Sequence, residues 1–151
     1  WSRVVTRRMV RNNRQSLSDA MTDTATDQLL AETKFDAQGL VPAIAQQHDT
    51  GEVLMMAWMN TDAIRETLAS GRVCYWSRSR AALWKKGETS GQIQALKELR
   101  VDCDGDTILV LVDQTGVACH TGRRNCFYRA VRDGAFVEKP AHPACGIASD
   151  R

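Results

Sequence analysis

The sequence is organised around residues 101–128, which read VDCDGDTILVLVDQTGVACHTGRRNCFY. Within this stretch, TILVLV at residues 107–112 is a β-branched and apolar run that predicts a buried strand. Acidic, thiol and imidazole side chains stand on both sides of that strand: Asp102, Asp104, Asp106, Cys103, Cys119, Cys126 and His120. Packing of a hydrophobic core does not require these polar side chains, so they are candidates for a functional site. Because carboxylates suit hard cations such as Mg²⁺ and thiolates suit Zn²⁺, we interpret the stretch as carrying candidate ligands for two metals.

The aspartates occupy alternate positions directly before the predicted strand. In an extended segment alternate side chains share a face, so Asp102, Asp104 and Asp106 are expected to converge. Cys103 is then expected to point to the other face, unless Gly105 bends the chain. An EF-hand does not fit, because that loop requires Gly at its sixth position and this sequence has Thr there. A solvated acidic turn is the remaining alternative.

The cysteines Cys103, Cys119 and Cys126 are too widely spaced for a zinc finger, with fifteen and six residues between them. Three thiolates without an obvious fourth ligand are typical of a catalytic zinc site, whose open position holds a water of lowered pKa. His120 is the candidate general base or water-orienting group, although a lone histidine is more often structural. Cys74 is expected in the core.

Composition restricts the class of protein. The 151 residues predict one domain, and no apolar run approaches the roughly 20 residues of a membrane-spanning helix. Residues 1–20 contain five Arg and one Asp, so the remaining chain is net acidic and general nucleic-acid binding loses its electrostatic basis. Five cysteines without a secretory signal indicate a reducing compartment, in which the thiols stay free to bind metal. No C-x-x-C motif supports a thiol redox protein.

Three segments are expected along the chain. Residues 1–33 are rich in Arg, Ser, Thr, Asn and Asp, and we interpret them as a leader that is largely disordered or foreign to the native chain. Residues 34–139 are expected to form the folded domain, and residues 140–151 a tail. Apolar runs and turn residues predict hairpins over 40–59 and 127–137, strands near 73–76, 93–101 and 107–112, and a helix from Asn60 or Thr61 to Ser70. The fold class is therefore α+β, a mainly antiparallel sheet with one or two short helices.

A basic segment follows the strand expected near 73–76. Guanidinium and ammonium groups, hydroxyls and glycines gather there and make a candidate phosphate-binding loop, with a solvated basic loop as the alternative. An indole in this segment is available to stack on a base or to pack against the core. The candidate substrate contacts are Arg78, Arg80, Trp84, Lys86 and Ser90.

Several long motifs in order resemble the phosphoribosyl-AMP cyclohydrolases of histidine biosynthesis. They are FDAQGLVPAIAQ, TGEVLMMAWMN, YWSRSRAALWKKGETSGQIQ, VDCDGDTILVLVDQTGVACHTG and NCFYR, between about residues 35 and 129. The resemblance implies hydrolytic opening of the adenine ring of N1-(5-phosphoribosyl)-AMP at the N1–C6 bond. It also implies a cytoplasmic, intertwined homodimer that binds Zn²⁺ and Mg²⁺.

The same resemblance implies roles for particular residues. Cys103, Cys119 and Cys126 match the zinc ligands, with Cys103 reaching a site shared with the partner subunit, and the three aspartates match the magnesium ligands. Asn125 stands where the family usually has Ser. A zinc-stabilised RNA-binding module, in which the thiols only hold the fold, is the alternative from another class.

Overall fold

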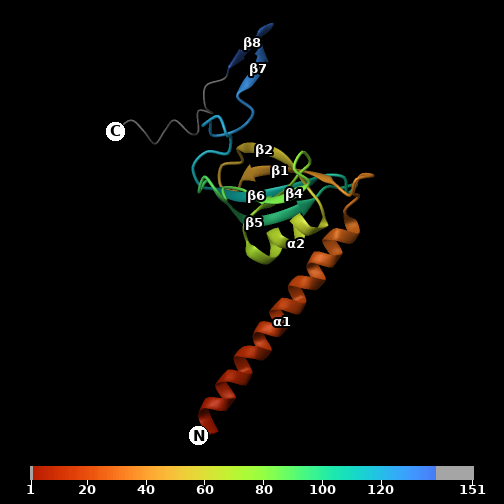
Figure 1. The fold of residues 1–151 in the computed structure, drawn as a ribbon, viewed down its shortest axis with the longest axis vertical. Coiled ribbons are helices and arrows are strands. Elements are labelled where there is room, and N and C mark those ends of the chain that lie inside the picture. The colour runs from red at the N-terminus through yellow and green to blue at the C-terminus, as the bar shows by residue number, and fades with distance from the viewer. Residues whose placement is uncertain (1, 139–151) are drawn as a thin grey trace, which may run out of the picture.

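The computed structural model describes residues 2–138, with side chains from Leu17 onward. Ten elements follow one another along the chain: α1 (Ser2–Glu32), β1 (Val41–Gln47), β2 (Val53–Met59), α2 (Thr61–Ser70), β3 (Cys74–Ser77), β4 (Ala82–Lys85), β5 (Gln94–Val101), β6 (Ile108–Gln114), β7 (Arg129–Arg132) and β8 (Ala135–Glu138). Figure 1 shows a central sheet, with α1 extending from one side and the β7–β8 hairpin standing at the other.

The main sheet has six strands in the order β4-β3-β2-β1-β6-β5. Its pairs are antiparallel except β1 and β6, which run parallel. The sheet curls, because the chain before β3 also bonds to β5: Val73 N donates to Gln94 O, and Leu96 N donates to Gly71 O. The predicted α+β class with a mainly antiparallel sheet is confirmed. The parallel pair was not predicted, since nothing local in either strand specifies a partner 65 residues away.

The core lies inside this curled sheet. Alternate residues of β1 and β6 are buried, as in Val41, Ala43 and Val110, and they meet the buried Leu54 of β2. Burying one such Val or Leu side chain stabilises the fold by about 1.5–3 kcal/mol. Cys74 is also buried, as predicted. Because the inward faces of these strands are occupied by apolar side chains, the candidate site residues lie at the strand ends and in the connecting loops.

Helix α2 begins and ends where its sequence predicts. The Asn60 side chain accepts a hydrogen bond from Ala63 N at 2.8 Å, and Gly71 ends the helix with a φ of 71°. Ala63, Ile64 and Thr67 form its buried face. The Thr67 hydroxyl accepts a bond from Cys74 N at 2.9 Å, which ties the helix to β3.

Two predictions about local structure are wrong. Residues 2–32, interpreted as a disordered leader, form the single helix α1. Its last turns pack Leu29 and Leu30 against the core, and Asp27 pairs with Arg65 of α2 at 3.0 Å. Among the described side chains of α1, those that pack on the core lie in these last turns, so the packing does not require the sustained apolar periodicity of an amphipathic helix. Residues 82–85, interpreted as part of a basic loop, form β4.

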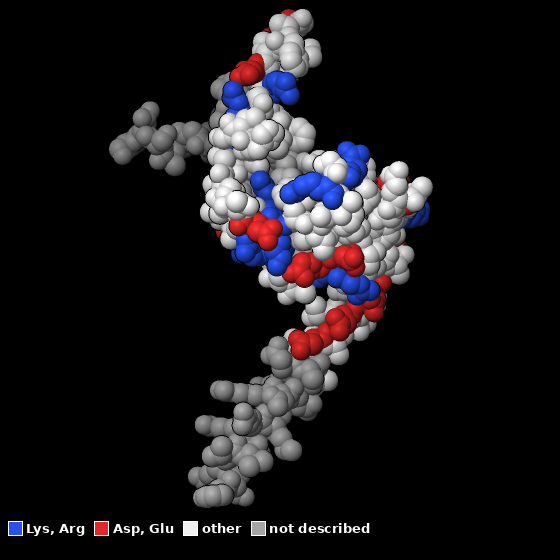
Figure 2. Space-filling model, viewed as in Figure 1, with Lys and Arg blue, Asp and Glu red and all other residues white. Residues whose placement is uncertain are grey.

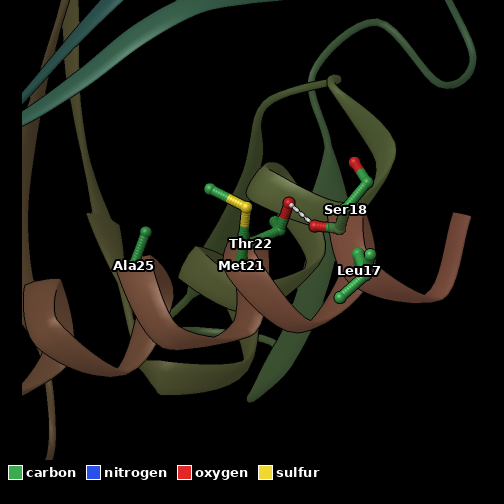
Figure 3. A pocket seen from close by; sticks show the side chains of 5 residues that line it. All are labelled: Leu17, Ser18, Met21, Thr22 and Ala25. Carbon is green, nitrogen blue, oxygen red and sulfur yellow. Dashed lines mark hydrogen bonds between the residues drawn. The ribbon is translucent and has the colours of Figure 1, made fainter. Parts of the chain in front are cut away.

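A surface pocket lies on α1, as Figure 3 shows; its lining residues are Leu17, Ser18, Met21, Thr22 and Ala25. It carries no charged or metal-ligating side chain, so the chemistry must be sought elsewhere. No helix among the described residues has the length and apolar character needed to cross a membrane.

The hairpin predicted around Asp133-Gly134 is confirmed as β7 and β8, which pair antiparallel with Arg132 opposite Ala135. Glu138 of β8 reaches back to Arg123 at 2.6 Å. The predicted tail at residues 140–151, with Cys145 and His142, falls outside the described residues.

Candidate functional site

The acidic cluster forms at the β5–β6 turn. One carboxylate oxygen from each of Asp102, Asp104 and Asp106 lies within 4.8 Å of the other two. The convergence was predicted, but the strand geometry behind that prediction is wrong, because β5 ends at Val101 and the aspartates occupy a turn. Gly105, at φ +82°, lets the chain reverse so that its N–H bonds to Asp102 O at 3.2 Å.

The close approach of the carboxylates shifts the pKa values of Asp102 and Asp106. The pKa of Asp106 is raised, first by its hydrogen bond with Asp102 and further by the charge of Asp104. The pKa of Asp102 is lowered although desolvation opposes this, because the Thr107 N–H and the neighbouring carboxyl groups donate to it. Crowded carboxylates of this kind are relieved by a cation, and an all-oxygen set suits Mg²⁺.

The turn that carries the aspartates rests on the end of α1. Gly105 O accepts a hydrogen bond from Lys34 N at 2.7 Å. A Cβ at Gly105 would lie 2.2 Å from Glu32 O, so the backbone approach requires glycine. Helix α1 therefore fixes the position of the acidic cluster, a role that the sequence did not reveal.

A thiol pair forms separately, in the loop after β6. We call residues 115–126 the cysteine loop. Cys126 N donates to Leu54 O of β2 at 2.8 Å, and the Cys119 Sγ lies 2.9 Å from the Thr121 hydroxyl. Desolvation and the nearby Cys119 raise the pKa of Cys126 to about 11. Desolvation also acts on Cys119, but hydrogen bonds from Thr121 and Cys126 outweigh it and lower the pKa of that thiol.

Cys103 does not join this pair. It is exposed in the acidic turn, before β6 begins, whereas Cys119 follows the end of β6. Seven strand residues separate the two ends, a span of about 20 Å. Among the described residues, no group of three metal-ligating side chains contains a cysteine. One copy of the chain thus brings together two of the three candidate zinc ligands.

A partly buried ion pair fixes the cysteine loop. Arg124 Nε lies 3.1 Å from Glu52 Oε2, and Arg124 Nη1 donates to Gly116 O at 2.8 Å. Asn125 Nδ2 donates to the other oxygen of Glu52 at 2.9 Å. Sequence reasoning missed Glu52 and Arg124, since 72 residues separate them. The only local signal was the position of Arg124 and Asn125 directly before Cys126.

Buried amides continue this network into the core. Arg124 Nη2 donates to Gln47 Oε1, which also accepts from Gln114 N at 3.0 Å. Gln94 Nε2 donates to Gln114 Oε1 at 2.9 Å, and the Tyr75 hydroxyl donates to Gln94 Oε1 at 2.6 Å. Because these polar groups are satisfied, the network is a rigid support for the loop rather than a defect of the core.

The structure divides the candidate substrate contacts into two groups. Trp84 packs on the Tyr75 ring at a centroid distance of 5.1 Å, so it belongs to the core margin. Lys86 turns toward the cysteine loop and donates to Ala118 O at 2.7 Å. Arg78, 4.7 Å from the Trp58 ring, remains at the surface.

The remaining predicted site residues lie at the surface. Arg80 Nε lies 3.4 Å from the Ser77 hydroxyl, and the Ser90 hydroxyl accepts from Gln92 N at 3.3 Å. His120 is exposed directly beside Cys119. On the face drawn in Figure 2, basic and acidic side chains are interspersed.

Fold and site together define a small α+β protein that carries a carboxylate trio and a separate thiol pair. Residues 55–128 match the family model described as phosphoribosyl-AMP cyclohydrolase. A phosphoribosyl-AMP cyclohydrolase of Rhodospirillum centenum is 72% identical over 131 residues, covering 83% of this chain and 98% of that protein. The protein of the same name from Paracoccus denitrificans is 63% identical over 116 residues, covering 76% and 96%.

The similarity is therefore sustained over most of both chains. The Granulibacter bethesdensis protein of that name is 78% identical over 105 residues, covering 69% of this chain and 82% of the relative. This chain belongs to the phosphoribosyl-AMP cyclohydrolase family. The 131-residue match also extends beyond residues 35–129, the range over which the motifs had suggested a resemblance.

Proposed function

We propose that this protein hydrolyses the adenine ring of N1-(5-phosphoribosyl)-AMP at the N1–C6 bond, a step of histidine biosynthesis. Membership of the family carries the proposal. The chemistry of the side chains supports it, because ring hydrolysis needs an activated water and a way to hold a doubly phosphorylated substrate. The four cysteines that the structure describes are free thiols, which fits a reducing compartment, and we place the reaction in the cytoplasm.

The residues divide the work between two metals. Cys119 and Cys126 would hold Zn²⁺, because the two thiols lie in contact within one loop and thiolates are ligands that zinc prefers. When bound, zinc lowers the pKa of a ligated water toward neutrality. The aspartate trio would hold Mg²⁺, which suits contacts with substrate phosphates.

Other side chains would position the substrate and move protons. His120 stands beside Cys119 and is exposed, so it is the candidate to accept a proton from the attacking water and deliver one to the departing ring nitrogen. Arg78 and Arg80 follow β3 on an exposed turn and offer guanidinium groups to phosphate.

The third zinc ligand would come from a second copy of the chain. Within one copy Cys103 lies at the far end of β6 from the thiol pair, and Cys103 is exposed. A two-fold related dimer that places the acidic turn of each subunit against the cysteine loop of the other completes two equivalent sites. The proposal is thus a homodimer with zinc sites shared between subunits.

The activity is tested by following ring opening of phosphoribosyl-AMP through its ultraviolet absorbance. We expect turnover by the metal-loaded protein, loss of turnover after zinc chelation, and recovery when zinc is returned. The far-ultraviolet circular dichroism spectrum should remain that of a folded protein throughout. A chain that does not open the ring when loaded with both metals would refute the proposed function. Undiminished turnover after complete removal of zinc would refute its metal dependence.

Sharing of the site is tested by mixing two inactive variants. Cys103→Ser retains the thiol pair, and Cys119→Ser retains Cys103. In a re-equilibrated mixture half of the dimers are mixed, and each mixed dimer has one complete site, so about a quarter of the wild-type activity should return. The control is each variant re-equilibrated alone. If both variants are inactive alone and their mixture stays inactive although mixed dimers have formed, the ligands are not shared.

A further inference from the structure

Lys86 differs from the other basic residues near it, because its side chain turns toward the cysteine loop. Its Nζ donates to the carbonyl of Ala118, the residue before Cys119, at 2.7 Å. Its neighbour Lys85 instead pairs with Glu66 of α2 at 2.9 Å. Two adjacent lysines therefore hold different partners, and only Lys86 contacts the segment that carries the thiols.

The backbone around Lys86 is fixed. Lys86 N donates to Val73 O at 3.0 Å. Gly87 follows with a φ of +76°, and a Cβ there would lie 2.3 Å from the Gln92 backbone. The ammonium group is therefore carried by a chain segment with little freedom to move, which makes its contact with Ala118 a defined one.

A second side chain of the same segment holds the preceding residue of the cysteine loop. Gln92 Oε1 accepts a hydrogen bond from Val117 N at 2.7 Å. Thr115 N also donates to Ile93 O at 2.9 Å. The backbone at residues 117 and 118 is thus clamped from one side, directly before the first thiol.

The charge of Lys86 also acts on both thiols. Partial burial lowers the pKa of Lys86, while Cys126 and Cys119 oppose that shift. In return, the ammonium helps to lower the pKa of Cys119 and counteracts the rise at Cys126. The bond from Lys86 Nζ to the carbonyl before Cys119 places this cation beside the cysteine loop, where it would compensate part of the negative charge that two thiolates bring to a metal site.

We infer that Lys86 is a positioning residue for the zinc ligands, which holds the backbone before Cys119 and compensates the charge of the thiolate pair. The inference rests on the proposed function, because it presumes that the pair binds zinc. It assigns Lys86 to the thiols in place of the phosphate contact that the sequence suggested. The segment that joins β4 to β5 then braces the metal site.

Zinc affinity of the full-length protein tests this inference. The apparent Kd for zinc is measured by competition with a chromophoric chelator for wild type, Lys86→Met, Lys86→Arg and the control Lys85→Met. Loss of a residue that supports metal ligands weakens metal binding by 10- to 100-fold in other proteins, so we expect about a tenfold weaker Kd for Lys86→Met. Lys86→Arg should recover most of the affinity, and Lys85→Met should bind as wild type does.

Several results would overturn the inference. One is a Lys86→Met protein that binds zinc as tightly as wild type, and another is an arginine variant as weak as the methionine variant, since charge would then be irrelevant. A raised KM with unchanged zinc affinity would assign Lys86 to the substrate. Should Lys86→Met fail to fold, Lys86→Gln removes the charge and keeps an N–H donor on a shorter side chain, and weaker zinc binding is again expected. If wild type binds no zinc, the proposed metal site itself fails.

Discussion

The pair of Glu52 and Arg124 supports the cysteine loop. Replacing Glu52 by Ala should therefore lower the free energy of unfolding more than the loss of an exposed ion pair would. The Glu52 side chain is 9% exposed and Arg124 is 25% exposed. The change removes the ion pair at 3.1 Å and the hydrogen bond from Asn125 at 2.9 Å. It also leaves the partly buried guanidinium of Arg124 without its carboxylate partner.

The expected magnitude follows from that burial. Removing one partner of a fully buried pair costs about 3–5 kcal/mol. Arg124 is a quarter exposed and keeps its bonds to Gly116 O and Gln47 Oε1, so we expect a loss of about 2–3 kcal/mol in the free energy of unfolding. Because the lost contacts flank Cys126, zinc should also dissociate more readily from this variant.

The assay is urea unfolding of the zinc-free protein at one fixed chain concentration, with the slope of the transition checked for constancy. Glu98→Ala is the matched control. Glu98 pairs with Arg100 at 2.7 Å, a shorter distance, but both side chains are 54% exposed. Exposed pairs contribute about 0–1 kcal/mol, so this control should change little. Equal effects of the two substitutions, or a Glu52→Ala variant as stable as wild type, would refute the reasoning.

Two further predictions concern Tyr75 and Gly105. Burial raises the pKa of Tyr75 far above its ordinary 10.0, so the unfolded chain loses a proton above pH 10 that the folded chain keeps, and stability falls there by up to about 1.4 kcal/mol per pH unit. The difference in unfolding free energy between wild type and Tyr75→Phe should shrink from pH 9 to pH 11, and a constant difference would contradict this. Gly105→Ala should lower the melting temperature more than Gly122→Ala, since both have positive φ but only at Gly105 would a Cβ meet backbone, 2.2 Å from Glu32 O. A similar loss for both would argue against the close packing of α1 on the acidic turn.

Much of the fold follows from local patterns. The capping Asn60 and the terminating Gly71 define α2, and the Asp133-Gly134 turn defines the last hairpin. These two predictions are confirmed because helix caps and tight turns are determined by a few neighbouring residues. The convergence of the three aspartates was also foreseen, although a turn and not a strand produces it.

What the sequence by itself determined is the set of chemical groups and their division along the chain, with the aspartates and Cys103 before β6 and Cys119 and Cys126 after it. Tertiary structure alone decided how those groups are held. Glu52 reaches Arg124, Lys86 reaches Ala118 and Gln92 reaches Val117 across many residues of chain. Such contacts depend on which strands lie side by side in the curled sheet, and on the packing of the end of α1 beneath Gly105. Pairing between distant segments is set by burial summed over the whole core, and no short stretch of sequence records it.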